Sequence, residues 1–117
     1  MYGDIAKVKE KCKIDTADYD NELETALEEA SNYIDVRVGQ YVNLPFVAVP
    51  NIINDIANDL AAAIWRENRA ESESYDDKHI ILFRSRAEAS LSFYISLLEA
   101  KERKKGATLD RNESWSV

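Results

Sequence analysis

The chain has 117 residues, with 15 basic against 22 acidic side chains, and its formal charge at neutral pH is −7. A chain of this length folds as one domain with a single hydrophobic core, and its acidic balance disfavours sequence-specific binding to nucleic acid, whose phosphates repel it. The 3 glycines and 2 prolines allow few tight turns, which favours long helices over the short strands of a β-sandwich.

The sequence also bears on the compartment in which the protein works. Its single cysteine, Cys12, provides neither a disulfide framework nor a CxxC motif, which is typical of a reducing compartment, and we expect it to be a small buried side chain. The first residues lack the apolar core of a signal peptide. No window approaches the roughly 20 apolar residues of a membrane span. We therefore expect a cytoplasmic protein without membrane contact.

Two helices are predicted in the first third of the chain. Residues 4–13 form a short helix candidate, followed by a connector. Apolar residues then recur at helical spacing from Leu23 to Val38, which predicts an amphipathic helix. Gly39 is expected to end this helix in the left-handed conformation. Eight acids and no bases lie between positions 15 and 35, which predicts a strongly anionic solvent face.

Residues 39–50 separate this helix from the next one. Both prolines of the chain lie here, and each pushes the residue before it out of the α region, so we expect an extended segment. It is apolar for a loop and should therefore lie against the core or against a partner. Pro50 suits the first turn of a helix, where its missing N–H costs nothing.

The third helix is expected to be the most buried one. Its apolar residues run from Ile52 to Ile64, and three consecutive alanines at 61–63 would let a neighbouring helix approach closely. It should end near Arg69 or Ala70, before a polar loop at 71–78.

A long helix is predicted from Asp77 to Lys105. Its apolar stripe stops at Leu98, so the last two turns should overhang the bundle. Gly106 is expected to end the helix, and residues 107–117 lack helix or strand periodicity.

These elements predict an all-α fold: a small helical bundle of three main helices plus a short N-terminal helix, with a long last helix and an irregular C-terminal tail. The helical domain is expected at 1–106 and the extended tail at 107–117. The predicted core includes Leu27, Ile34, Ile56, Leu60, Phe83 and Leu91.

Motifs of enzymatic chemistry are missing from the sequence. There is no phosphate-binding glycine loop and no GxSxG elbow, and the single histidine, His79, cannot supply a multi-histidine metal site. Asp55 and Asp59, like Glu24 and Glu28, are carboxylates one turn apart, and we interpret both pairs as solvated helix faces rather than cation or acid–base sites. We expect no catalytic residues, no metal and no cofactor.

The most specific pattern is a helix–loop–helix segment. It reads Tyr33-Ile34-Asp35-x-Arg37, then Leu44-Pro45-x-x-x-x-Pro50, then Ile52-Ile53-x-x-Ile56-Ala57-x-Asp59-Leu60-Ala61. This segment resembles the head–tail connector proteins of tailed bacteriophages, also called adaptor or head-completion proteins. Arg86-Ala87-x-x-x-Leu91 is similar to the last helix of that family, so the resemblance covers about residues 20–106.

The resemblance implies a structural role in a virion or prophage and no enzymatic activity. Connectors form a homo-oligomeric ring beneath the portal, so the implied partners are the portal protein, neighbouring connector subunits, and the next head-completion or tail protein. The implied location is the host cytoplasm during assembly and then the head–tail junction of the virion. The residues that match the family's motif are Arg37, Leu44, Pro45, Pro50 and Asp59.

Arg37 and Asp59 interrupt apolar surroundings on helices that we expect to be neighbours. We predict that they pair and orient the loop between them; the alternative is two unrelated surface charges.

Partner contacts are expected at the apolar loop, at the basic end of the last helix and in the tail. The basic run could instead be a solvated helix end that complements the macrodipole, and the tail could fold back on the bundle. The predicted contact residues are Tyr41, Phe46, Val47, Lys101, Arg103, Lys104, Lys105, Leu109 and Trp115.

Three other functions are compatible with the sequence. The protein could be a host helical interaction or regulatory module that shares only a bundle. It could be an acidic mimic of nucleic acid that binds a basic partner in a salt-sensitive way. It could also be a metal-dependent enzyme that uses one of the carboxylate pairs.

Overall fold

A computed structural model of the chain describes residues 1–70 and 77–114, and the side chains of residues 1–69 and 78–103. Its helices are α1 (Ile5–Cys12), α2 (Asp20–Val38), α3 (Asn51–Ala70) and α4 (Asp77–Ser114), with no strand in the described ranges. The predicted all-α bundle of three main helices and a short N-terminal helix is confirmed. Most of the polar loop predicted at 71–78 lies outside the described residues.

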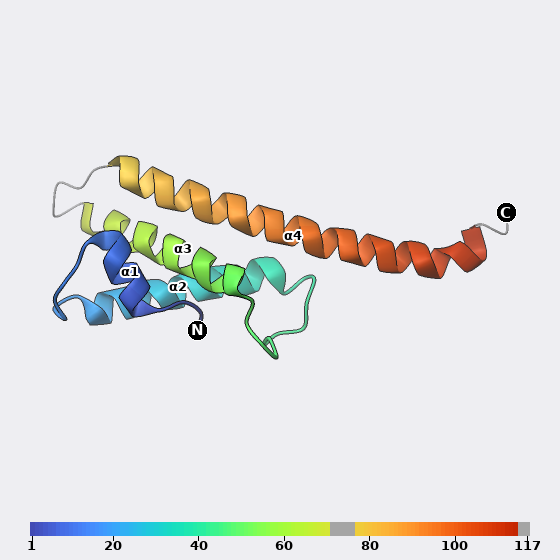
Figure 1. The fold of residues 1–117 in the computed structure, drawn as a ribbon, viewed down its shortest axis with the longest axis horizontal. Helices are drawn as coiled ribbons and strands as arrows, with labels where there is room; N and C mark the ends of the chain where they lie inside the picture. The colour runs from blue at the N-terminus through green and yellow to red at the C-terminus, as the bar shows by residue number, and fades with distance from the viewer. Residues whose placement is uncertain (71–76, 115–117) are drawn as a thin grey trace.

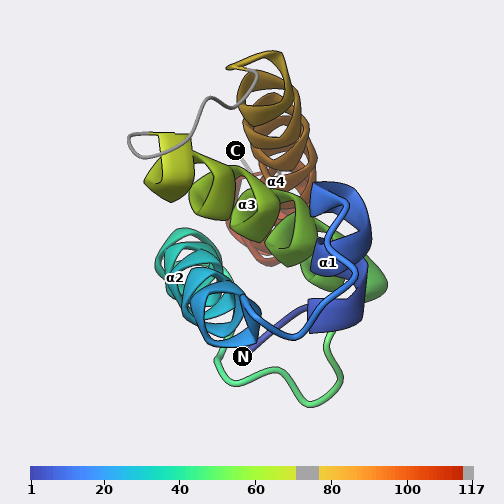
Figure 2. The same ribbon diagram turned by 90° about the vertical axis from the view of Figure 1, so that its left-hand side faces the viewer.

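Helix α3 occupies the centre of the bundle. α1 and α2 pack against it on one side and α4 packs along the other (Figures 1 and 2), whereas α2 and α4 meet only narrowly. The three alanines at 61–63 are completely buried, and their small side chains let the neighbouring helices approach closely. All six core residues named from the apolar spacing are buried, which confirms that part of the prediction.

The C-terminal ends of α1 and α2 have different backbone conformations, and the conformation predicted for the end of α2 is wrong. Asp4 caps α1 by accepting a hydrogen bond from the Ala6 N–H, and Lys13 ends that helix with φ 58° in the left-handed region. The left-handed residue predicted at Gly39 is wrong, because Gly39 has φ −62° and continues the right-handed turn. Glycine has a steric advantage there instead: an added Cβ would lie 2.7 Å from the Asp35 carbonyl oxygen.

The segment at 39–50 is bent rather than extended. The N–H groups of Tyr41 and Val42 both donate to the Val38 carbonyl, at 2.9 and 3.1 Å, so the chain turns back directly after α2. These bonds satisfy a carbonyl that the helix end leaves without a partner. The Leu44–Pro45 peptide is cis, and Pro50 directly precedes α3, where its carbonyl accepts hydrogen bonds from the first turn.

Helix α4 is longer than predicted. It continues through Gly106 to Ser114, so the helix end at Gly106 is wrong and the tail is helical over 107–114. Glycine inside a helix costs only about 1 kcal/mol relative to alanine, which a long helix can absorb. The predicted overhang is confirmed: the C-terminal part of α4 extends past the end of the bundle (Figure 1).

Candidate interaction surfaces

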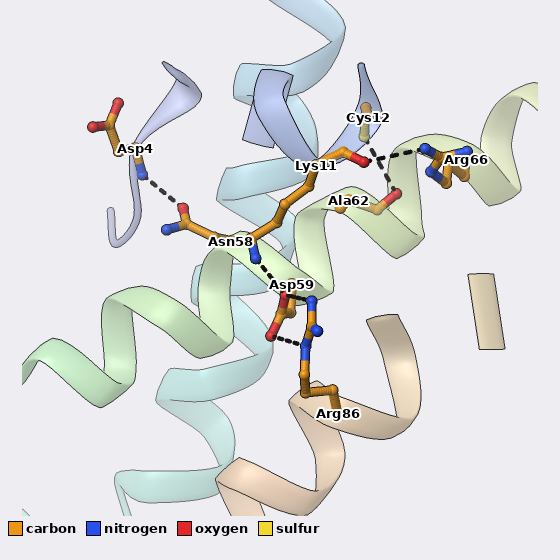
Figure 3. A network of polar contacts seen from close by, with 8 residues as sticks. All are labelled: Asp4, Lys11, Cys12, Asn58, Asp59, Ala62, Arg66 and Arg86. Atoms are coloured by element: carbon orange, nitrogen blue, oxygen red, sulfur yellow. Dashed lines mark hydrogen bonds and ion pairs between the residues drawn. The ribbon is translucent and has the colours of Figure 1, made fainter. Parts of the chain in front are cut away.

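A charged junction holds three helices together (Figure 3). The Asp59 side chain on α3 accepts two hydrogen bonds from Arg86 on α4, at 3.0 Å from Nε and 2.8 Å from Nη2, and Lys11 Nζ on α1 lies 2.9 Å from its Oδ1. Asp59 is only 6% exposed, so the interpretation of this residue as part of a solvated face is wrong. The hydrogen bonds that Arg86 donates to the Asp59 carboxylate raise the pKa of the Arg86 guanidinium.

Arg37 belongs to a separate cluster between α2 and α4. Its Nη1 donates to the Tyr33 hydroxyl at 2.7 Å and to Glu88 Oε2 at 3.2 Å, and the Tyr33 hydroxyl donates to Glu88 Oε1 at 2.6 Å. The predicted pair of Arg37 with Asp59 is therefore wrong. Arg37 pairs instead with Glu88 and Asp59 with Arg86, both on α4. Arg37 and Asp59 lie on neighbouring helices, but on faces that do not meet.

The N-terminal arm supports the loop between α2 and α3. The Tyr2 hydroxyl donates to Asp35, the Tyr2 N–H donates to Ser31 Oγ at 2.9 Å, and the Tyr2 ring packs edge-on against Phe46 with centroids 5.9 Å apart. Burial, followed by the bond to Asp35, raises the pKa of Tyr2 to about 12. Sequence reasoning missed Tyr2, because no local pattern marks an arm that is held by distant side chains.

Some side chains of the loop at 39–50 pack against the core, and others are exposed to solvent. Leu44 and Phe46 are partly buried against the core, and Tyr41 donates a 2.9 Å hydrogen bond to Glu99 on α4, which raises the pKa of Tyr41. Val47 is fully exposed at the tip of the loop. Among the predicted contact residues of this loop, Val47 is thus the one whose side chain is wholly available to a partner.

A cleft lies where α4 leaves the bundle. It has a volume of about 500 Å³ between residues 39–43 and the α4 side chains Leu98, Lys101 and Glu102. A second hollow of about 320 Å³ adjoins it at Tyr41 and Arg103. Lys101 and Arg103, two of the predicted contact residues, are exposed. Lys104, Lys105 and Leu109 lie in α4, but their side chains are outside the described part, as is Trp115.

Helix α4 also carries a line of exposed apolar side chains. Leu82, Phe93 and Leu97 are each more than half exposed, while Phe83 and Leu91 are buried. Sequence reasoning missed this line because the stronger stripe at 80–98 was assigned to the core. Leu82, Phe93 and Leu97 follow each other at steps of 11 and 4, which is helical spacing and could have indicated a second face.

The described residues contain no cluster of three or more histidine, cysteine or acidic side chains able to hold a metal ion. Within the same ranges, no helix is both long enough and apolar enough to cross a membrane. Cys12 is buried as predicted; its Sγ lies 4.0 Å from the Ala62 carbonyl oxygen, and burial raises the pKa of its thiol.

Comparison with known protein families places this small helical bundle among bacteriophage proteins. The matching family model is described as Bacteriophage Mu, Gp36, and it covers residues 4–93, from the cap of α1 into the middle of α4. The chain belongs to the bacteriophage Mu Gp36 family. Neither the curated proteins nor the solved structures gave a match.

Proposed function

We propose that this phage protein is a head–tail connector: a structural, non-catalytic subunit that forms a ring beneath the portal and bridges it to the tail or to the next head-completion protein. The observation that carries the proposal is the family match over residues 4–93, which contains the whole helix–loop–helix segment that resembles connectors. Because the chain belongs to a bacteriophage family, a role in the virion is also favoured over that of a host regulatory module. The protein would act in the host cytoplasm during assembly and then at the head–tail junction.

The positions of the exposed loop at 39–50 and of the protruding part of α4 support a bridging role. The loop at 39–50 and the protruding part of α4 lie at the same end of the molecule (Figure 1). The loop presents Val47 to solvent, and α4 presents Lys101 and Arg103 beside the cleft. A partner at this end would meet an apolar tip and a basic helix, so we assign this end to the portal.

The acidic balance suits a protein that surrounds a DNA passage. A formal charge of −7 repels the phosphate backbone, so packaged DNA could pass without being held. No sequence-specific contact with nucleic acid and no membrane contact are part of this proposal.

The test is binding to the portal protein of the same phage, with negative-stain microscopy and sedimentation as readouts. We expect the wild-type protein to add a ring of density below portal particles. Val47→Asp should lower the affinity at least tenfold, because it places a charge in the apolar contact without disturbing the bundle. Thr16→Asp is the matched control, since it adds the same charge at an exposed site in the connector between α1 and α2. This connector lies at the opposite end of the bundle from the loop at 39–50 (Figure 1).

Wild-type protein that leaves portal particles unchanged would overturn the connector function. Equal loss of binding in Val47→Asp and Thr16→Asp would overturn the assignment of the loop end to the portal. Portal and major capsid genes next to this gene would be an independent supporting observation.

A further inference from the structure

The exposed surface in the middle of α4 carries no charge. Between Arg86 and Glu99 the sequence contains one charged residue, Glu88, whose carboxylate binds Arg37 on α2. The exposed positions of this stretch are Ala89, Ser92, Phe93, Ser96 and Leu97. A helix at the surface of a protein normally presents charged or polar side chains to water. In a chain with 32% charged residues, this uncharged surface is therefore suited to burial.

The large apolar side chains of α4 outside the core form one stripe. Leu82, Phe93 and Leu97 are 51%, 59% and 51% exposed. At about 3.6 residues per turn, Leu82 and Phe93 lie about half a turn around the helix from the completely buried Leu91, and Leu97 lies about a third of a turn from it. α4 itself lies at the edge of the bundle, with the other helices to one side of it (Figure 2). A covering for the stripe therefore has to come from another molecule.

We propose that a second copy of the chain covers this stripe. The two α4 helices pack antiparallel across a two-fold axis near Ala89, with Leu82 of each copy against Leu97 of the other. This dimer goes beyond the connector function and does not depend on it.

The order of large and small side chains along α4 fits this register. Leu82 and Leu97 lie equally far on either side of the midpoint between Ala89 and Ser90, so an antiparallel partner matches both leucines at once. The small side chains at the midpoint let the two helices approach closely.

The same register sets Phe93 of one copy opposite Arg86 of the other. The Arg86 side chain is 47% exposed while its guanidinium holds Asp59, so it can also contact a ring from outside. A guanidinium beside an aromatic ring is a favourable contact. Each large side chain of the stripe thus has a partner in the second copy.

Charge favours the antiparallel orientation over the parallel one. Residues 71–78, where α4 begins, carry four acids and one base, whereas residues 101–105 carry one acid and four bases. Antiparallel packing brings the acidic start of each α4 near the basic part of the other, and it also opposes the two helix dipoles. Parallel packing would bring acids to acids and bases to bases, and like charges suppress such a pairing.

The first experiment is sedimentation velocity over a concentration series that reaches the millimolar range. Because both copies use the same stripe, the contact closes at two copies, and we expect a monomer–dimer equilibrium for the wild type. Phe93→Asp should weaken dimerisation at least tenfold. Val36→Asp is the matched control: it places the same charge on an exposed valine of α2, and should dimerise like the wild type. Circular dichroism checks that both variants remain folded.

The second experiment tests the orientation by disulfide cross-linking. In the antiparallel dimer Ser85 of one copy lies beside Ser96 of the other, whereas each serine is more than about 10 Å along the helix from its own counterpart. Both serines are exposed, and Cys12 is buried and does not compete. Under mild oxidation, a mixture of Ser85→Cys and Ser96→Cys should cross-link at least tenfold faster than either protein alone. Thr16→Cys, mixed with either one, measures random collision.

Three outcomes would overturn the inference. One is a wild-type protein that stays monomeric at every concentration or that associates beyond the dimer. Another is equal dimerisation of Phe93→Asp and Val36→Asp, which would place the contact elsewhere. The third is cross-linking of the mixed cysteine variants no faster than of each variant alone, which would reject the antiparallel register.

Discussion

The carboxylate of Asp59 receives both hydrogen bonds that the Nε and Nη2 groups of Arg86 donate, at 3.0 and 2.8 Å. This bidentate geometry joins the centre of α3 to α4, and Lys11 adds α1 to the same carboxylate. An acid that is nearly buried and shared by two cations fixes how three helices are rotated relative to one another.

We expect Asp59→Asn to lower the free energy of unfolding by about 1–3 kcal/mol, because the side chain keeps its volume but loses the charge that both cations need. Arg86→Gln should cost less, since Lys11 still pairs with Asp59 and the Arg86 side chain is 47% exposed. Urea unfolding of both single variants and the double variant gives the coupling energy. A value indistinguishable from zero would show that the pair does not contribute to stability.

The two sides of α4 should respond differently to the same substitution. Leu91→Ala should cost about 2–5 kcal/mol, because Leu91 is completely buried and its removal leaves a cavity. Leu82→Ala, on the exposed side of the same helix, should change stability by less than about 0.5 kcal/mol. Both are measured by chemical unfolding at a low protein concentration. Similar costs at the two sites would mean that α4 is not oriented as described.

Lys13→Gly should stabilise the protein. Lys13 is exposed and holds φ 58° and ψ 45° at the end of α1, a conformation that costs a side-chain-bearing residue about 1–2 kcal/mol. Glycine removes this cost but adds freedom to the unfolded chain, so we expect a net gain of about 0.5–1 kcal/mol. Thermal unfolding measures it. Lys13→Ala serves as the control and should bring no gain, since alanine keeps the Cβ.

The Tyr2 phenol makes stability depend on pH in the alkaline range. Its pKa is about 12 in the folded protein against an ordinary value of 10.0, so the folded state binds this proton more tightly than the unfolded state does. The resulting stabilisation is complete below pH 10.0 and is lost as the pH rises towards about 12. Ultraviolet titration of tyrosinate should show a late-titrating group that disappears in Tyr2→Phe, while Tyr33 and Tyr41, whose pKa values are also raised, still titrate late in that variant. Unchanged late titration in that variant would assign it to another tyrosine.

Removing residues 107–117 should leave the melting temperature nearly unchanged and weaken binding to the portal. The reason is that the C-terminal part of α4 extends beyond the helices of the bundle. Calorimetry measures the first effect and sedimentation with portal particles the second. Normal portal binding by the shortened chain would remove the end of α4 from the contact and leave the loop at 39–50 as the candidate. A large drop in melting temperature would show that the segment supports the bundle.

Local sequence determined the helices themselves. Apolar residues at helical spacing located α2, α3 and the buried side of α4, because a helix buries one stripe wherever it packs. The sequence predicted the residues that end the helices less well. Gly39 was expected to be left-handed, but Lys13 takes that conformation, because a helix end depends on the hydrogen bonds of the following residues as well as on the residue type.

Tertiary structure decided which side chains meet. Arg37 and Asp59 both stand out in the sequence, yet their partners are Glu88 and Arg86, both on α4. The reason is geometric: spacing along a helix defines a face, but the rotation and crossing of separate helices decide which faces come together. The sequence thus determined an acidic all-α bundle of the phage family. Only the packing of α4 against both α3 and α2 decided which charges meet, because it brings Glu88 to Arg37 on α2 and Arg86 to Asp59 on α3.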